Sequence, residues 1–339
     1  MTKTDLSLAQ WRRAALDMQM QMGKVVLGQQ SAIRLLVIAA FARGHLLLEG
    51  DVGVGKTTLL RAYSRAIGGT VERVEGTVDL MPSDLIYHTY VDPQGKPRVD
   101  PGPLLRHGEG LSVFFFNEIN RARPQVHSLM LRVMAERTVS AFDRTYFFPH
   151  VQVIADRNRV ERDETYEIPA AARDRFLMEF NIEMPADREM QRELMFSTRF
   201  HDVDRLIDSN VQNAVPYAQL NDIATQIQDS VSASETLERY ALDLAEATRQ
   251  PEKYGIQLVD DNEPLVQSGM SPRGMSMLMR AARVNAWLEE RETLLPQDIH
   301  AVFHPCVGHR IFLKPVYEMR RDVIIPLLTT EILNRVTVP

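Results

Sequence analysis

Residues Gly50 to Thr57 carry the spacing in this sequence that most directly predicts chemistry. They match G-x-x-x-x-G-K-[ST], in which glycines let backbone N–H groups converge on phosphate oxygens, the lysine reaches the outer phosphates and the threonine holds Mg²⁺. An apolar segment, 45–49, precedes this loop and a helical pattern follows it, which is the order the motif requires. The predicted site for ATP or ADP consists of Gly50, Asp51, Val52, Gly53, Val54, Gly55, Lys56, Thr57 and Thr58.

A second polar pair, Asn117 and Glu118, directly follows the apolar run 113–116. A phosphate-loop NTPase carries here an aspartate that steadies Mg²⁺ and a glutamate that polarises water. Asn117 is a neutral amide, so the site has one negative charge fewer beside the cation. Magnesium keeps most of its ligands as waters and phosphate oxygens, and an amide can still orient one of those waters. We predict Thr57 and Asn117 at the metal, Glu118 as a catalytic group, and hydrolysis that the missing charge can slow.

The segments that must position these motifs predict an α/β core. Five short apolar runs have the composition of buried parallel strands, namely 45–49, 70–74, 112–116, 150–155 and 176–182. Helical patterns lie between several of them, and beyond residue 185 strand-like runs give way to helical periodicity at 235–249 and 274–290. We therefore predict an αβα sandwich with a mainly parallel five-stranded sheet over residues 1–185, followed by an all-helical domain over 186–339.

Two connections have recognisable local patterns. Residues 87–91 and 96–99 flank Asp92-Pro93-Gln94-Gly95, a turn sequence, which predicts a hairpin inserted between the second and third strands. The stretch 254–269 is polar and aperiodic, and we predict a loop there. His309-Arg310 is expected to be a helix-end feature and not a catalytic pair.

Bulk composition limits the class of protein. A chain of 339 residues suggests two domains. A net charge of −6, with 45% hydrophobic and 25% charged residues, is typical of globular proteins and argues against nucleic acid as the main partner. Cys306 is the only cysteine, the first residues are polar, and the longest apolar run, 35–42, is shorter than the roughly 20 residues that cross a bilayer. We expect a cytoplasmic protein without a membrane segment.

Taken together, these motifs resemble the MoxR branch of the AAA+ superfamily, which is related to the ATPase subunit of magnesium chelatase. The resemblance covers nearly all of the chain and is also carried by segments 44–50, 80–84, 101–104 and 117–122. It implies a P-loop AAA+ core with a helical lid domain, ATP and Mg²⁺ as cofactors, and a homo-oligomeric ring, expected to be hexameric. It also implies a von Willebrand factor A-domain partner and a client enzyme complex that is remodelled, matured or loaded with a cofactor or metal.

The same resemblance implies roles for residues outside the two motifs. Asn158 occupies the place of the sensor-1 asparagine, and Arg273, which follows Ser271-Pro272 at a helix start, that of the sensor-2 arginine. Arg175 is similar to the arginine finger that enters the neighbouring subunit's ATP site, with Arg173 as the competing candidate. A further pair, Gly28-Gln29, matches residues near the adenine, and an ordinary loop is the alternative there.

Several positions depart from the family pattern. Asn117 stands where the family has aspartate, and Arg157 and Arg159 flank Asn158 where the family has Gln and Pro; these arginines contact phosphate or face solvent. The hairpin at 87–99 resembles an insertion directed toward the ring pore, with a solvated edge hairpin as the alternative. The leading hypothesis is an ATP-hydrolysing ring that remodels a partner. The alternative is a nucleotide-binding assembly module with little turnover because of Asn117.

Overall fold

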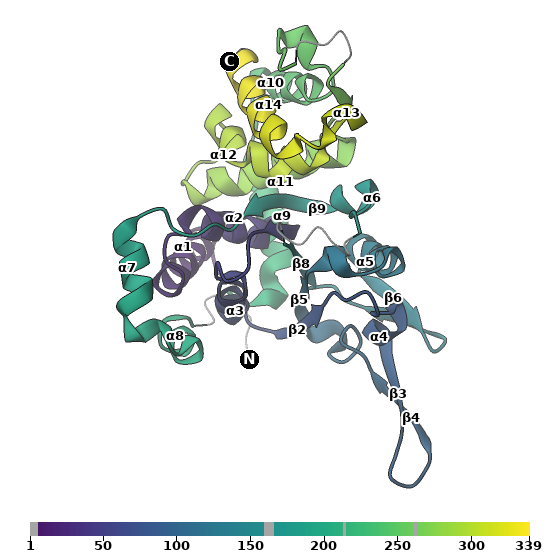
Figure 1. Cartoon of the computed structure of the whole chain (residues 1–339). Helices are drawn as coiled ribbons and strands as arrows, with labels where there is room; N and C mark the ends of the chain where they lie inside the picture. The colour runs from purple at the N-terminus through teal and green to yellow at the C-terminus, as the bar shows by residue number, and fades with distance from the viewer. Residues whose placement is uncertain (1–5, 159–165, 213–214, 260–263) are drawn as a thin grey trace. The chain divides into compact units, whose positions relative to one another are not determined.

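The computed structural model describes residues 6–158, 166–212, 215–259 and 264–339 (Figure 1). The chain forms two compact units, one of Met1–Arg175 with Phe180–Asn221 and the other of Phe176–Glu179 with Asp222–Pro339. Helices α7 (Arg188–Phe196) and α8 (Val203–Asn210) follow the expected domain boundary at residue 185 and belong to the first unit. Helix α8 belongs to the first unit because it packs against α1 (Leu8–Val25) and α3 (Lys56–Ile67).

A five-stranded sheet forms the core, with the strand order β2-β5-β8-β1-β9. The pairs β2–β5, β5–β8 and β8–β1 are parallel. All five predicted strands are present, with ends that differ by at most two residues from the predicted ones. Their bounds are β1 His45–Glu49, β2 Thr70–Glu75, β5 Leu111–Asn117, β8 Gln152–Arg157 and β9 Phe176–Asn181. The central strands β5 and β8 are buried along almost their whole length, as expected of a parallel sheet covered on both faces.

Helices cover this sheet through buried apolar stripes. Figure 1 shows α1, α2 (Gln30–Phe41) and α3 on one side of the sheet and α5 (Pro124–Glu136) on the other. The predicted face of α3 is buried and consists of Leu59, Leu60, Tyr63 and Ile67. Gly68, with φ of 66°, ends this helix. The predicted αβα sandwich is therefore confirmed.

Two hairpins extend from the first unit. The predicted one consists of β3 (Tyr87–Val91) and β4 (Pro97–Pro101), and the carboxylate of Asp92 closes its turn by accepting from the N–H groups of Gln94 and Lys96. The second, of β6 (Thr138–Ala141) and β7 (Arg144–Phe147), was not predicted. Its turn residues Phe142 and Asp143 are left-handed without a glycine, so the sequence lacks the usual hairpin signal there.

The second unit is mainly helical. Its longer helices are α9 (Leu220–Ser230), α10 (Glu235–Ala247), α11 (Pro272–Leu288), α12 (Pro296–Val307) and α14 (Arg321–Arg335). Between them lie short helical pieces such as α13 (Pro315–Glu318) and a small sheet, in which β10 (Val266–Ser268) pairs with β11 (Phe312–Leu313). The prediction of a loop over 254–269 was therefore wrong at β10, because its pairing partner is distant in sequence. Residues 260–263 of that stretch lie outside the described part of the chain.

Polar residues fix the ends of the second unit's helices. Ser271 caps α11 by accepting from Gly274 N–H at 3.0 Å, with Pro272 in the first turn. After α12, the buried Arg310 donates to the carbonyl oxygens of Cys306 and Phe176, so the expected helix-end role of His309-Arg310 is confirmed.

Burial raises the pKa of the Cys306 thiol to about 12. Across the described ranges, helices that combine the length and apolarity needed to span a bilayer are absent.

Gly76 lies where the chain leaving β2 approaches the end of β5 closely. Its N–H donates to the carbonyl oxygen of Asn117 at 2.7 Å. A Cβ at this position would lie 2.1 Å from the carbonyl oxygen of Glu118 and 2.9 Å from its carbonyl carbon. These are backbone atoms that cannot rotate away, so only glycine fits without moving the end of β5.

We predict that Gly76→Ala lowers the free energy of unfolding by about 1–3 kcal/mol, because the added methyl group overpacks against the backbone of β5. Chemical denaturation followed by circular dichroism measures this change. Gly110→Ala is the matched control, since the nearest atom to a Cβ there is Thr70 Oγ1 at an ordinary 3.9 Å. Equal effects of the two substitutions would contradict the close approach at Gly76.

Candidate nucleotide site

The loop between β1 and α3 has the conformation that its glycines predict. Gly53 and Gly55 have φ of 84° and 95°, and Gly55 is the residue that caps α3. A Cβ at either position would meet no atom within 4 Å, so the left-handed backbone, and not crowding, is what requires glycine there. The first N–H groups of α3 have no acceptor within the helix and lie at its positive end. This is a ready-made binding place for anions such as phosphate.

The start of the loop is fixed by the segment that follows β9. Ile182 N–H donates to the carbonyl oxygen of Glu49 at 2.7 Å. A Cβ on Gly50 would lie only 2.4 Å from the carbonyl oxygen of Ile182, so the first loop glycine is required by close packing. Lys56 then folds back over the loop, and its Nζ donates to the carbonyl oxygen of Gly50 at 2.6 Å. The ammonium group therefore lies inside the turn, where phosphates would be bound.

Lys56 also contacts a carboxylate, that of Asp156 near the end of β8. Its Oδ2 lies 3.4 Å from Lys56 Nζ, and its Oδ1 accepts from Glu118 N–H at 2.5 Å. The Asp156 side chain is fully buried. Burial raises the pKa of this carboxyl group, and the Glu118 N–H and the charge of Lys56 oppose that shift. Asp156 was not among the predicted site residues, although an acidic residue at the end of an apolar run was an available signal.

Asn117 and Glu118 lie together at the end of β5, as predicted. In the orientation that lets it donate, the Asn117 amide nitrogen lies 3.2 Å from Oδ2 and 3.3 Å from Oδ1 of Asp156. Glu118 has a left-handed backbone, with φ of 53° and ψ of 50°. Its Oε2 accepts from Arg121 Nη1 at 2.9 Å. An ion pair with Arg121 thus holds Glu118 at the strand end, beside Asp156.

Asn158 lies one residue beyond β8 and is 7% exposed. Its Oδ1 is buried, and among the described residues it has no hydrogen-bond partner. A buried amide oxygen in this state calls for a ligand or water. On one side of it, Arg157 Nη2 contacts Glu49 Oε2 at 3.2 Å, so an ion pair occupies this arginine. Arg159 lies outside the described residues.

Gly28 and Gln29 pack against the segment after β9. Gly28 has φ of 73°, and a Cβ there would lie 2.6 Å from Pro185 Cβ. Gln29 Nε2 donates to the carbonyl oxygen of Glu183, and its side chain is buried. These contacts give the pair a structural role, and the contact with adenine stays a prediction.

The three candidate arginines differ in their surroundings. Arg173 ends the short helix α6 (Ala170–Arg173) and is 9% exposed. Arg175 is half-buried, and its Nη1 donates to the carbonyl oxygen of Ala171 at 2.7 Å. Arg273 is exposed on the first turn of α11 in the second unit. Their roles toward a nucleotide, in this subunit or a neighbouring one, stay predictions.

The residues that the structure brings together fit a magnesium–nucleotide complex. The loop amides and Lys56 suit the phosphates, and the hydroxyl of Thr57 with the oxygens of Asn117 and Asp156 suits a hard cation and its waters. The Asn158 oxygen at the same sheet edge, which has no partner among the described residues, is compatible with a polar ligand there.

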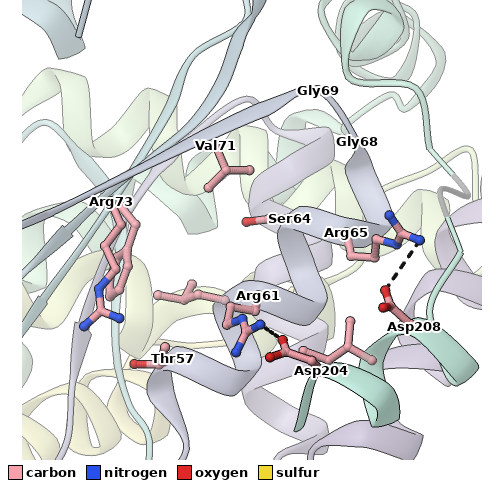
Figure 2. A pocket seen from close by; sticks show the side chains of 13 residues that line it. Thr57, Arg61, Ser64, Arg65, Gly68, Gly69, Val71, Arg73, Asp204 and Asp208 are labelled. Atoms are coloured by element: carbon pink, nitrogen blue, oxygen red, sulfur yellow. Dashed lines mark ion pairs between the residues drawn. The ribbon is translucent and has the colours of Figure 1, made fainter. Parts of the chain in front are cut away.

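A cavity of about 760 Å³ lies along α3 and touches the loop at Thr57 (Figure 2). Its walls carry the ion pairs Arg61–Asp204 and Arg65–Asp208, which join α3 to α8. Lys56 and Glu118 are not among its lining residues. The cavity is therefore a neighbour of the phosphate loop and distinct from it.

Two family models match the parts of the chain that carry this geometry. Residues 45–178 match the ATPase family associated with various cellular activities (AAA). Residues 260–326 match the AAA lid domain. The first match includes the phosphate loop and the ends of β5 and β8, and the second covers helices of the second unit.

Full-length relatives extend the match. The chain is 57% identical to Protein MoxR of Methylorubrum extorquens over 99% of this chain and 98% of that protein. It is 31% identical to Chaperone MoxR1 of Mycobacterium tuberculosis over 93% of this chain and 80% of that protein. The crystal structure of a candidate ATPase from Cytophaga hutchinsonii superposes with a TM-score of 0.84 at 30% identity, over 98% of this chain and 97% of that one. With its phosphate loop and strand-end polar cluster, the chain belongs to the MoxR family of AAA ATPases.

Proposed function

We propose that this protein is a MoxR-type ATPase that works as a hexameric ring. It uses ATP binding and hydrolysis to remodel or mature a partner protein complex, or to load a cofactor or metal into that complex. The observation that carries the ATPase part is the position of Lys56. Its ammonium group lies inside the glycine-lined turn and also contacts the polar cluster at the ends of β5 and β8. A phosphate chain bound at the N-terminus of α3 would meet both groups.

Each residue's contribution follows from its chemistry. The N–H groups of the loop and Lys56 bind the phosphates, and Thr57 with Asn117 binds the metal or its waters. Bound Mg²⁺ supplies positive charge that offsets the charge developing on the phosphates. Glu118 orients the attacking water and takes up its proton, which requires Arg121 to share or release the carboxylate. Asn158 orients the same water or the terminal phosphate with its amide.

Arginines complete the site in this proposal. Arg175 acts as the finger in the neighbouring subunit's site, and Arg273 senses the nucleotide from the helical domain. The greater exposure of Arg175 compared with Arg173 supports its choice, because a group that acts on another subunit must reach out of its own. Gly28 and Gln29 are proposed to flank the adenine.

The partner is proposed from family membership and from one exposed element. The relative from Mycobacterium tuberculosis is named a chaperone. We propose a von Willebrand factor A-domain protein as the partner and an enzyme complex as the client. The β3–β4 hairpin supports a contact with a partner, because Tyr90, Val91 and Val99 on it are exposed and apolar.

A second candidate function is a nucleotide-binding assembly module with little turnover. Two observations favour it: Asn117 brings no charge to the metal, and the carboxylate of Glu118 is already paired with Arg121. Comparison of turnover in the wild type and in a variant without the Glu118 carboxylate separates the two functions.

We predict that Glu118→Gln retains ATP and releases phosphate at least about 100-fold more slowly, because the amide keeps the shape of the side chain and cannot accept the proton of water. A phosphate-release assay, with a fluorescent ATP analogue to report binding, measures both quantities. Glu189→Gln is the control, since Glu189 is an exposed glutamate of the same unit, 81% accessible. Measurable and equal turnover in the wild type and Glu118→Gln removes Glu118 from the mechanism. Negligible turnover in both proteins favours the assembly module.

We further predict that subunits with Arg175→Ala and subunits with Lys56→Ala, each inactive alone, regain activity when mixed. In randomly mixed rings about a quarter of the interfaces combine an intact phosphate loop with an intact arginine from the neighbour. Steady-state ATPase activity of the mixture measures this recovery, and native mass spectrometry verifies that mixed rings have formed. Mixed rings that stay inactive would refute action of Arg175 in the neighbouring site, and the same experiment with Arg173→Ala tests the competing arginine.

A further inference from the structure

The buried carboxylate of Asp156 has partners that all belong to the candidate nucleotide site. They are the ammonium of Lys56, the N–H of Glu118 and the amide of Asn117. A carboxylate that is fully buried is costly unless charge and hydrogen bonds compensate it. Here the compensation comes from the phosphate-binding lysine and from the two residues at the end of β5.

Strand register explains how Asp156 reaches Asn117. Strands β5 and β8 are parallel neighbours, and their last paired residues are Phe116 and Ala155. Asn117 and Asp156 each come one residue later, so their side chains emerge side by side at the same edge of the sheet. The amide nitrogen of one lies within 3.3 Å of both oxygens of the other. Moving the carboxylate from one strand to the other would therefore shift the negative charge only by the width of this contact.

We propose that Asp156 supplies from strand β8 the carboxylate that Asn117 does not supply from strand β5, so that this contacting pair together binds the waters of magnesium. The inference rests on the proposed function, since it concerns the metal of the same nucleotide site. It removes the reason to expect a defective site from Asn117 alone, because the pair has one negative charge and one amide whichever strand carries which.

Asp156 has a second effect, on Glu118. Its Oδ1 accepts the Glu118 N–H at 2.5 Å and so holds this residue in its left-handed conformation. Asp156 is thus a positioning residue that acts through the metal's waters and through the backbone of Glu118. A carboxylate that served only to neutralise Lys56 would have no effect on the metal, and the dependence of nucleotide binding on Mg²⁺ distinguishes the two roles.

The test is a transposition of the two side chains. The probe is a fluorescent ADP analogue, titrated onto full-length protein at a series of Mg²⁺ concentrations. We expect Asp156→Asn to raise the Mg²⁺ concentration for half-maximal effect by about tenfold or more, because one unit charge near a divalent cation is lost. The double variant Asn117→Asp with Asp156→Asn has the atoms and net charge of the wild type in exchanged places. We expect it to restore the Mg²⁺ dependence to within about threefold of the wild type.

Asp143→Asn is the charge-matched control, since Asp143 is exposed in the β6–β7 turn and asparagine tolerates its left-handed backbone. A wild-type Mg²⁺ dependence in Asp156→Asn, or a double variant no better than the single one, overturns the proposal. If Asp156→Asn alone fails to fold, the double variant decides: recovery of both folding and Mg²⁺ dependence supports the pair, and failure of either overturns it. Absence of analogue binding in the wild type would instead refute the proposed function, so the two failures are distinguishable.

Discussion

The contact between the ammonium of Lys56 and the buried carboxylate of Asp156 joins the phosphate loop to the core of the sheet. Lys56 begins helix α3 and Asp156 is the next-to-last residue of strand β8, so this ion pair connects the anion-binding helix start to the strands that carry the polar cluster. Burial of either charge costs free energy, and the other charge or an equivalent ligand offsets that cost. The ion pair therefore organises the site before any nucleotide enters. A bound phosphate would compete with Asp156 for the same ammonium.

Parallel strands explain why so few residues suffice to build the site. The strands β1, β5 and β8 run in the same direction, so the loop, Glu118, Asp156 and Asn158 all meet at their carboxyl ends. Close backbone packing at Gly50 and Gly76 fixes the loop and the end of β5 relative to neighbouring segments. The positions of the charged groups thus depend on backbone contacts that only glycine permits.

Sequence patterns predicted the sheet and the loop because both depend on local signals. Each core strand is a continuous apolar run, and Gly53 and Gly55 of the loop are required by backbone conformation alone. The β6–β7 hairpin and the short strand β10 could not be predicted in the same way, because the first turns without glycine and the second pairs with residues far along the chain. The charge balance of the site was also missed. Asn117 suggested a lost carboxylate, whereas its contact with Asp156 exists only once β5 and β8 are side by side.

Calorimetric titration of the purified protein with ATP in excess Mg²⁺ tests this account most directly. We expect a saturable signal corresponding to one site per chain, and its loss in Lys56→Ala, whose side chain reaches neither the phosphates nor Asp156. The absence of any heat of binding in the wild type up to millimolar nucleotide would contradict the account. Undiminished binding in Lys56→Ala would show that nucleotide is held elsewhere.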